Sequence, residues 1–336
     1  MTIRVAVVGA GSWGTTVAGF TAVNTPTRLW AREPELADTI NTRHENDRYL
    51  AGFSLPDVLR ATHDIEEAVG DADVVVMAVP SHGFRDVLRQ AAPHIRPWVP
   101  VVSLSKGLEA GTLKRMSEVV HDELPGHPVA VLTGPNLARE IIAGQPAASV
   151  VAIPDDVIAA ELQRIFATSR LRIYTNPDVV GCELSGVVKN VIAIAAGMAE
   201  GMGFGDNTRA TLITRGLAEM SRLGVALGAD PLTFSGLAGM GDLIATCSSR
   251  QSRNNTVGLQ LGQGHTIEEI TSAMNMVAEG VKSSPSVQLL ARQHGVEMPI
   301  TDQVVAVCHE GKSAADALRS VMAREQKAEL HGIRSR

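Results

Sequence analysis

The chain opens with IRVAVVGAGSWG at residues 3–14, an apolar run that ends in a glycine-rich turn. Residues 3–8 are mostly β-branched, which is typical of a strand buried on both faces of a parallel sheet. Gly9, Gly11 and Gly14 have the Gly-x-Gly-x-x-Gly spacing that allows a tight turn, a close approach to pyrophosphate, and packing of helix on strand. A helix over residues 12–23 would offer free N–H groups to phosphates. We therefore predict a dinucleotide site, and the alternative is a glycine-rich turn that binds nothing.

Further apolar strands alternate with amphipathic helices in the first half of the chain. This alternation predicts βαβ units and a mostly parallel sheet. We expect a helix at residues 81–91 and strands at residues 27–30, 73–79, 99–104, 129–132 and 149–153.

The second half has a different texture, with no proline between Pro177 and Pro231. It predicts helices over residues 179–223, 267–276, 286–294 and 314–330, and almost no strands. We therefore predict a Rossmann-type α/β domain over residues 1–176 that binds NAD or NADP. An all-helical substrate domain over residues 177–336 is expected to follow it.

Composition narrows the classes of function. The net charge of −6 and the 3% of aromatic residues argue against a nucleic-acid-binding surface, so an anionic substrate would need a local cluster of cations. The three cysteines lack Cys-x-x-Cys spacing, which argues against a disulfide framework or a zinc site. The first residues form a strand rather than a signal peptide, and no run of about 18 apolar residues occurs. We expect a cytoplasmic protein without membrane insertion.

The end of the second predicted strand bears on cofactor preference. An acid there would bind the ribose hydroxyls of NAD, whereas an arginine would accommodate the 2′-phosphate of NADP. Arg32 favours NADP, but Glu33 is its neighbour and could equally belong to the first turn of the next helix. NADP is slightly favoured, and NAD stays open.

Other motifs fail on inspection. Gly311-Lys312-Ser313 resembles the end of a P-loop, but the required glycine is replaced by Ala306. The histidines show neither His-x-His nor His-Glu-x-x-His spacing, so we expect no catalytic metal.

Two lysines stand in positions suited to chemistry. Lys106 follows the predicted strand at residues 99–104, so it would emerge at the carboxyl edge of the sheet, where open α/β folds bind ligands. Lys189 interrupts an apolar helix and could be a partly desolvated lysine with a lowered pKa that exchanges a proton with a carbonyl oxygen. The alternatives are a solvated loop lysine at 106 and a snorkelling lysine at 189.

Residues 237–255 gather small residues, hydroxyl groups, Asp242, Arg250 and Arg253. Such a segment can place bidentate donors around a phosphate. The alternative is a polar surface loop.

Taken in order, these segments resemble the NAD(P)-dependent glycerol-3-phosphate dehydrogenases. The resemblance implies interconversion of dihydroxyacetone phosphate and sn-glycerol 3-phosphate, supply of the latter for phospholipid synthesis, and a homodimer. It rests on Gly9-Ala10-Gly11-Ser12-Trp13-Gly14-Thr15, Leu29-Trp30-Ala31-Arg32, Ser105-Lys106-Gly107-Leu108-Glu109, Thr133-Gly134-Pro135-Asn136, Val187-Val188-Lys189-Asn190, Gly239-Met240-Gly241-Asp242-Leu243, Ser252-Arg253-Asn254 and Ala278-Glu279-Gly280.

The resemblance also implies roles for individual residues. Lys189 would give or take the proton at the substrate oxygen, Lys106 would contact substrate beside the cofactor, and Asp242 would orient and charge Lys189. The remaining implied substrate contacts are Gly134, Asn136, Thr246, Ser252, Arg253 and Asn254. The implied cofactor contacts are Gly9, Gly11, Ser12, Trp13, Gly14, Arg32, Lys106, Ala138, Arg253, Val277 and Glu279.

One departure and two alternatives qualify this interpretation. Many members have a hydroxyl residue and an aromatic after Gly-Pro, where this chain has Asn136-Leu137. A related two-domain reductase could act on a hydroxy acid of the 6-phosphogluconate or ketopantoate type. A cofactor-binding sensor without turnover is the second alternative, and Lys189 and Asp242 argue against it.

Overall fold

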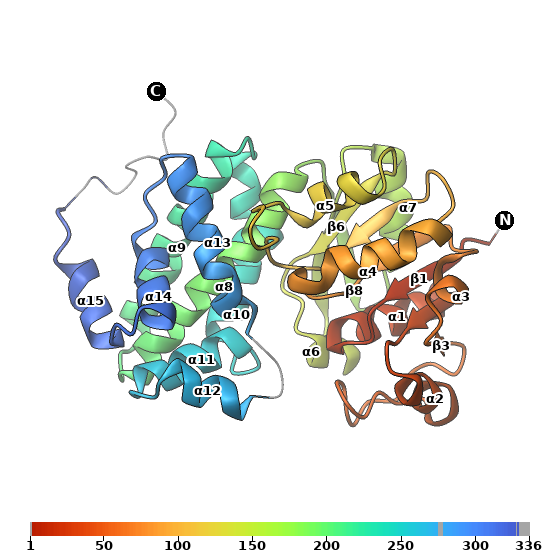
Figure 1. Cartoon of the computed structure of the whole chain (residues 1–336), viewed down its shortest axis with the longest axis horizontal. Coiled ribbons are helices and arrows are strands. Elements are labelled where there is room, and N and C mark those ends of the chain that lie inside the picture. Colours follow the sequence, from red (N-terminus) through yellow and green to blue (C-terminus); the bar gives the residue numbers. More distant parts are fainter. Residues whose placement is uncertain (1, 275–277, 327, 329–336) are drawn as a thin grey trace. The chain divides into compact units, whose positions relative to one another are not determined.

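The computed structural model describes residues 2–274, 278–326 and 328, which form two compact units (Figure 1). The first unit comprises Met1–Ser105 and Lys114–Val179, and the second comprises Lys106–Leu113 and Val180–Arg336. The sequence predicts one boundary near residue 176 and gives no sign that Lys106–Leu113 belongs to the second unit.

The first unit is built on an eight-stranded sheet with the order β3-β2-β1-β4-β5-β6-β7-β8. Every neighbouring pair is parallel except β6 and β7, which are antiparallel. The strands are β1 (Val5–Val8), β2 (Thr27–Trp30), β3 (Arg60–Thr62), β4 (Val74–Met77), β5 (Val101–Ser103), β6 (Val129–Thr133), β7 (Ala147–Ala152) and β8 (Leu171–Asn176).

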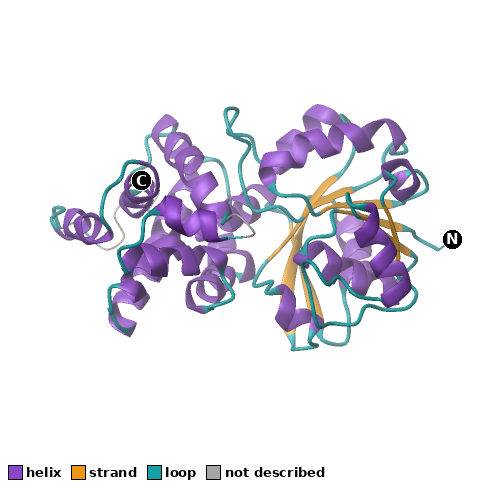
Figure 2. Ribbon diagram, turned by 60° about the horizontal axis from the view of Figure 1, so that its bottom comes forward, coloured by secondary structure: helices purple, strands orange, loops and turns teal. Residues whose placement is uncertain are grey.

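Helices cover both faces of this sheet (Figure 2). Successive side chains of a strand point to opposite faces, so Val5 and Val7 of β1 enter one hydrophobic core while Ala6 and Val8 enter another. Helices α1, α2 and α7 pack in the first core, and α3, α4 and α5 in the second. The α-helices of this unit are α1 (Ser12–Asn24), α2 (Pro34–Arg43), α3 (Ile65–Val69), α4 (Phe84–Ala91), α5 (Met116–Glu123), α6 (Ala138–Ile142) and α7 (Asp156–Phe166).

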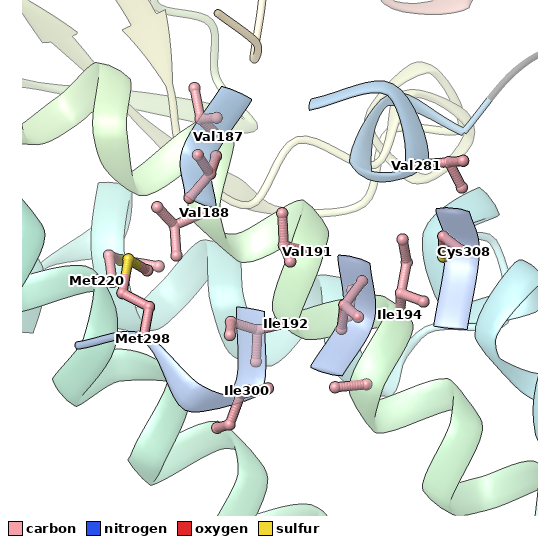
Figure 3. Close-up of a cluster of buried hydrophobic side chains, with 14 of the residues drawn as sticks. Val187, Val188, Val191, Ile192, Ile194, Met220, Val281, Met298, Ile300 and Cys308 are labelled. Carbon is pink, nitrogen blue, oxygen red and sulfur yellow. The ribbon is translucent and has the colours of Figure 1, made fainter. Parts of the chain in front are cut away.

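In the described part of the second unit, Lys106–Leu113 contains no helix and helices joined by loops make up the rest; the core surrounds one long helix, α8 (Val179–Gly201). Figure 3 shows Val188, Val191 and Ile192 of α8 beside side chains from other helices, including Met220 and Ile300. By length and composition α8 could cross a membrane, but 89% of its most apolar window is buried, as in the core helix of a folded domain. The other helices are α9 (Asp206–Ala226), the short 3-10 helix η3 (Pro231–Ser235), the π-helical turn η4 (Leu237–Gly241), α10 (Asp242–Ser248), α11 (Arg253–Gly262), α12 (Ile267–Ala273), α13 (Glu279–Gln293), α14 (Pro299–His309) and α15 (Ala314–Met322).

Glycines allow α8 and α11 to touch through their backbones. A Cβ atom on Gly258 would lie 2.1 Å from the carbonyl oxygen of Ile194, and one on Gly197 would lie 2.1 Å from the carbonyl oxygen of Asn255. No real side chain fits such distances, so α8 and α11 pack closely only because both carry glycine at the contact.

The structure confirms the predicted Rossmann-type α/β fold followed by an all-helical region. It adds several details: β3, β8 and α14 were not predicted, and the helical stretches expected over residues 179–223 are α8 and α9. The helix expected to reach residue 330 ends at Met322, because the polar run Arg324-Glu325-Gln326 offers no apolar face to bury.

We expect Gly258→Ala to destabilise the chain by about 1–3 kcal/mol, because the new methyl group overlaps backbone that cannot move independently. The control is Gly19→Ala within α1, where the added Cβ would lie 3.7 Å from Pro56 and a helical alanine is favoured by up to about 1 kcal/mol. Urea denaturation followed by circular dichroism measures both variants. Equal midpoints for the two variants would contradict the close-contact interpretation.

Candidate active site

The predicted site residues fall into two groups, one on each unit. On the first unit, the glycine-rich turn lies between β1 and α1, where the strand order reverses between β1 and β4. Gly9 has a φ of 120°, and a Cβ on it would lie 2.7 Å from the carbonyl oxygen of Ala78. A Cβ on Gly14 would lie 2.0 Å from the carbonyl oxygen of Gly9, so both positions need glycine to bring helix and strand together.

Gly11 differs from the other two, because a Cβ there would meet no described atom within 4 Å. Gly11 is the N-cap of α1 without a side-chain hydrogen bond, and the first turn of α1 has no acidic residue. The indole Nε1 of Trp13 is buried and has no hydrogen-bond partner among the described residues. An uncapped helix N-terminus, open space over Gly11 and an unpaired donor all fit a bound dinucleotide.

The residues that follow β2 place two opposite charges side by side. Nη2 of Arg32 lies 3.1 Å from Oε1 of Glu33, and Glu33 is the N-cap of α2 without capping it through its side chain. Glu33 therefore lies at the helix start, as one alternative expected, although as the N-cap and not as a residue of the first turn: its carbonyl accepts from the backbone N–H groups of Leu36 and Ala37.

Asn136 and Gly134 lie after β6. Gly134 has a φ of 130°, and a Cβ on it would lie 3.2 Å from Cα of Ser149, so the turn requires glycine. The Ser149 hydroxyl donates to Oδ1 of Asn136 at 2.5 Å. Nδ2 of Asn136 is buried and has no partner in the described part of the chain. Asn136 thus has an amide donor that no described residue occupies. Ala138 follows as the first residue of α6.

The second unit brings Lys106, Lys189, Asp242 and Thr246 together. Nζ of Lys189 donates to Oδ1 of Asp242 at 2.6 Å and to Oγ1 of Thr246 at 2.7 Å. Nζ of Lys106 donates to the other carboxylate oxygen of Asp242 at 2.7 Å. Two ammonium groups therefore share one buried carboxylate.

Local structure explains how these side chains meet. Asp242 and Thr246 are four residues apart on α10, so they lie on the same face, and the Thr246 hydroxyl donates back to Asp242 at 3.3 Å. Gly186 lies one turn before Lys189 on α8, and a Cβ on it would lie 3.1 Å from Cγ of Lys106. The glycine leaves room for the Lys106 chain to lie against α8.

Burial changes the chemistry of Lys189. Its residue is only 6% exposed, so the snorkelling alternative is wrong. Removal from water lowers its pKa from 10.5 to about 8; the Asp242 carboxylate opposes this shift, and the nearby Lys106 charge reinforces it. A lysine with this pKa can both give and take a proton near neutral pH.

Asn254 and Asn190 form a buried polar network next to this cluster. Nδ2 of Asn254 donates to Oδ1 of Asn190 at 2.9 Å, and Oδ1 of Asn254 accepts from the backbone N–H of Gly280 at 2.9 Å. Nδ2 of Asn190 donates to the backbone carbonyl of Lys106 at 3.2 Å. The network joins α8, α11, the start of α13 and the Lys106 segment. Asn190 was not among the predicted site residues, although its place in an apolar helix was a signal.

The remaining predicted residues lie at helix starts. Ser252 is the N-cap of α11, and its hydroxyl accepts from the backbone N–H of Asn255 at 3.2 Å. Arg253 is the first residue of α11, and Glu279 is the first residue of α13. Val277, also predicted to contact the cofactor, lies outside the described residues.

Comparison with known proteins gives a consistent result over almost the whole chain. The family described as "NAD-dependent glycerol-3-phosphate dehydrogenase N-terminus" matches residues 4–159, and that described as "NAD-dependent glycerol-3-phosphate dehydrogenase C-terminus" matches residues 178–319.

Individual relatives agree with the family match. A glycerol-3-phosphate dehydrogenase NAD(P)+ 2 from Sphingopyxis alaskensis is 56% identical over 331 residues, which cover 98% of this chain and 99% of the relative. A glycerol-3-phosphate dehydrogenase NAD(P)+ from Mycobacterium avium is 53% identical over 98% of this chain and 97% of its own length. The crystal structure of glycerol-3-phosphate dehydrogenase from Coxiella burnetii has a TM-score of 0.92 at 37% identity, with 96% and 99% of the two chains covered. The chain belongs to the NAD-dependent glycerol-3-phosphate dehydrogenase family.

Proposed function

We propose that this chain interconverts dihydroxyacetone phosphate and sn-glycerol 3-phosphate with NAD(P)H or NAD(P)+. The observation that carries the proposal is the buried ammonium of Lys189, which Asp242 and Thr246 hold in place and Lys106 adjoins. Reduction of a ketone needs an acid beside the carbonyl oxygen, and the Lys189 ammonium in this cluster can serve as that acid.

The carbonyl oxygen of the ketone gains negative charge as its carbon is reduced. When bound, the reduced nicotinamide supplies the hydride. Lys189 stabilises the growing charge on the substrate oxygen and gives it the proton, and a site sheltered from water makes that stabilisation stronger. One carboxylate oxygen of Asp242 holds the Lys189 ammonium, and the other holds the ammonium of Lys106. In the reverse direction, the neutral amine of Lys189 takes the proton from the C2 hydroxyl of glycerol 3-phosphate.

Substrate phosphate is assigned to the start of α11. Arg253 supplies a guanidinium with the planar donor geometry that suits phosphate, at a helix N-terminus that itself favours anions. Anchoring the phosphate there would hold the reacting carbon at the lysine and lower the entropic barrier. Nδ2 and Oδ1 of Asn254 each bind one protein group, which leaves one N–H and one lone pair of the amide for a ligand. We therefore assign Asn254 to the substrate beside Arg253, together with Ser252, which caps this helix start. Asn136 and Gly134 are assigned to substrate contacts from the first unit.

The cofactor is assigned to the first unit, with Gly9, Gly11 and Gly14 forming the turn. Ser12, Trp13, Ala138 and Arg32 are proposed contacts, together with Lys106, Arg253, Val277 and Glu279 from the second unit. The exposed Arg32 guanidinium supports NADP as the favoured form, and NAD is the second candidate.

We place the enzyme in the cytoplasm as a homodimer that supplies glycerol 3-phosphate for phospholipid synthesis, and we place its domain boundary near residue 176. A spectrophotometric assay of NADPH and NADH oxidation with dihydroxyacetone phosphate, ketopantoate and 6-phosphogluconate-type substrates tests the reaction. Cofactor binding without oxidation of any of these substrates would favour the sensor alternative.

Replacing Lys189 with alanine is expected to lower turnover on the order of 100-fold or more, because the proton donor is lost. Cofactor affinity, measured by quenching of intrinsic fluorescence, should stay largely intact. Lys312→Ala is the matched control in the same unit, since Nζ of Lys312 binds Gln303 and Ser320 rather than the cluster. Turnover of Lys189→Ala equal to that of Lys312→Ala would refute the assignment.

The pH dependence should reveal the same lysine. Reduction of dihydroxyacetone phosphate needs the protonated form of Lys189, so kcat/KM for reduction should fall as the pH rises through about 8. Oxidation of glycerol 3-phosphate needs the neutral amine, so kcat/KM for oxidation should rise through the same pH. Initial rates in both directions over a series of buffers measure the two profiles. Profiles in which both directions change in the same sense across this pH would contradict the role of Lys189.

A further inference from the structure

Arg48 lies in the loop between α2 and β3 and reaches back to the end of β2. Its Nη1 is 3.6 Å from Oε1 of Glu33, the same carboxylate oxygen that Nη2 of Arg32 contacts at 3.1 Å. Two guanidinium groups thus flank one carboxylate, which leaves an excess of positive charge just beyond the carboxyl end of β2.

The loop that carries Arg48 is fastened to the glycine-rich turn. Asn46 is fully buried, and its Nδ2 donates to the carbonyl of Ala10 at 2.9 Å and to the hydroxyl of Thr15 at 2.7 Å. Its Oδ1 accepts from the backbone N–H of Tyr49 at 2.9 Å, and the Ser12 hydroxyl donates to the backbone carbonyl of Tyr49 at 2.6 Å. These contacts on both sides of Arg48 fix its backbone relative to the turn assigned to the pyrophosphate.

The Arg48 side chain is also oriented. Its guanidinium carbon lies 5.3 Å from the centre of the Tyr49 ring, a distance typical of a cation–π contact. The side chains of Arg48 and Arg32 are 56% and 77% exposed, and each guanidinium has more donors than Glu33 can occupy. Both can therefore bind a second anion while they contact Glu33.

The charges at this position decide between the two cofactors. A free acid after β2 would accept the ribose hydroxyls of NAD and repel a 2′-phosphate. Here the Glu33 carboxylate is engaged by two arginines, and guanidinium donors match the geometry of a phosphate.

We propose that Arg48 and Arg32 together bind the 2′-phosphate of NADP, which makes Arg48 a specificity-determining residue. This inference rests on the cofactor site of the proposed function and adds a residue that the sequence motifs did not indicate.

The test is calorimetric titration of the full chain with adenosine 2′,5′-bisphosphate and adenosine 5′-monophosphate, which differ only in the 2′-phosphate. The wild type should bind the bisphosphate more tightly. Arg48→Ala should weaken bisphosphate binding about 10-fold or more, as expected for loss of a charge-assisted contact, and should change monophosphate binding by less than about 2-fold.

The matched control is Arg43→Ala. Arg43 is an exposed arginine near the same loop, but it pairs with Glu45 and Asp47 instead of Glu33. The Arg43→Ala substitution removes the same charge as Arg48→Ala, but from a side chain that does not contact Glu33. The bisphosphate affinity of this control should stay within about 2-fold of the wild type, since exposed pairs and distant surface charges contribute little.

Several results would overturn the inference. It fails if Arg48→Ala weakens both nucleotides equally, if Arg43→Ala has the same effect as Arg48→Ala, or if the wild type does not prefer the bisphosphate. Turnover tests the proposed function independently of these binding results. Oxidation of NADH in the presence of dihydroxyacetone phosphate would support the proposed function even if the binding results excluded a role for Arg48. Absence of both nucleotide binding and turnover would remove the inference and the proposed function together.

Discussion

The site depends on one buried carboxylate that holds two ammonium groups. Without Asp242, the charges of Lys106 and Lys189 would repel each other in a poorly hydrated environment, and burial of an unpaired ammonium is strongly unfavourable. With Asp242, one oxygen serves each lysine, and an excess positive charge is kept where a substrate oxygen would become negative. The same burial that makes the arrangement costly brings the pKa of Lys189 into the range useful for proton transfer.

The helical packing maintains this environment. Lys189 lies in the middle of α8, whose residues from Gly181 to Ala199 are buried. Glycine contacts bring α11 against α8, and the Asn190–Asn254 hydrogen bond joins the same two helices beside the lysine. The backbone of Lys106 is joined to this network through Asn190. Packing and polar contacts thus position the cluster from both sides, which favours a fixed rather than a mobile ammonium.

Sequence reasoning succeeded where the controlling physics is local. The glycine spacing in residues 9–14 determines the turn between β1 and α1, and a lysine in an apolar helix already indicates desolvation. It failed where distant segments decide the outcome. The short strands β3 and β8 depend on their neighbours in the sheet, and no local pattern shows that Lys106–Leu113 belongs to the helical unit. The hydrogen bonds that hold Asn254 between Asn190 and Gly280 join three helices, and no spacing rule could have shown them. Arg48 was missed because Asn46 places its loop through buried contacts to residues far earlier in the chain.

The proposed chemistry requires the Lys189 ammonium to titrate in a poorly hydrated site while bound to Asp242. Nuclear magnetic resonance of lysine side chains, with Lys189→Arg used to assign the signal, measures its pKa directly. A midpoint near 8 is expected, well below the ordinary value of 10.5, because burial disfavours the charged amine. A midpoint at or above the ordinary value would show that Lys189 is solvated or simply salt-bridged, and would contradict its role as the proton donor.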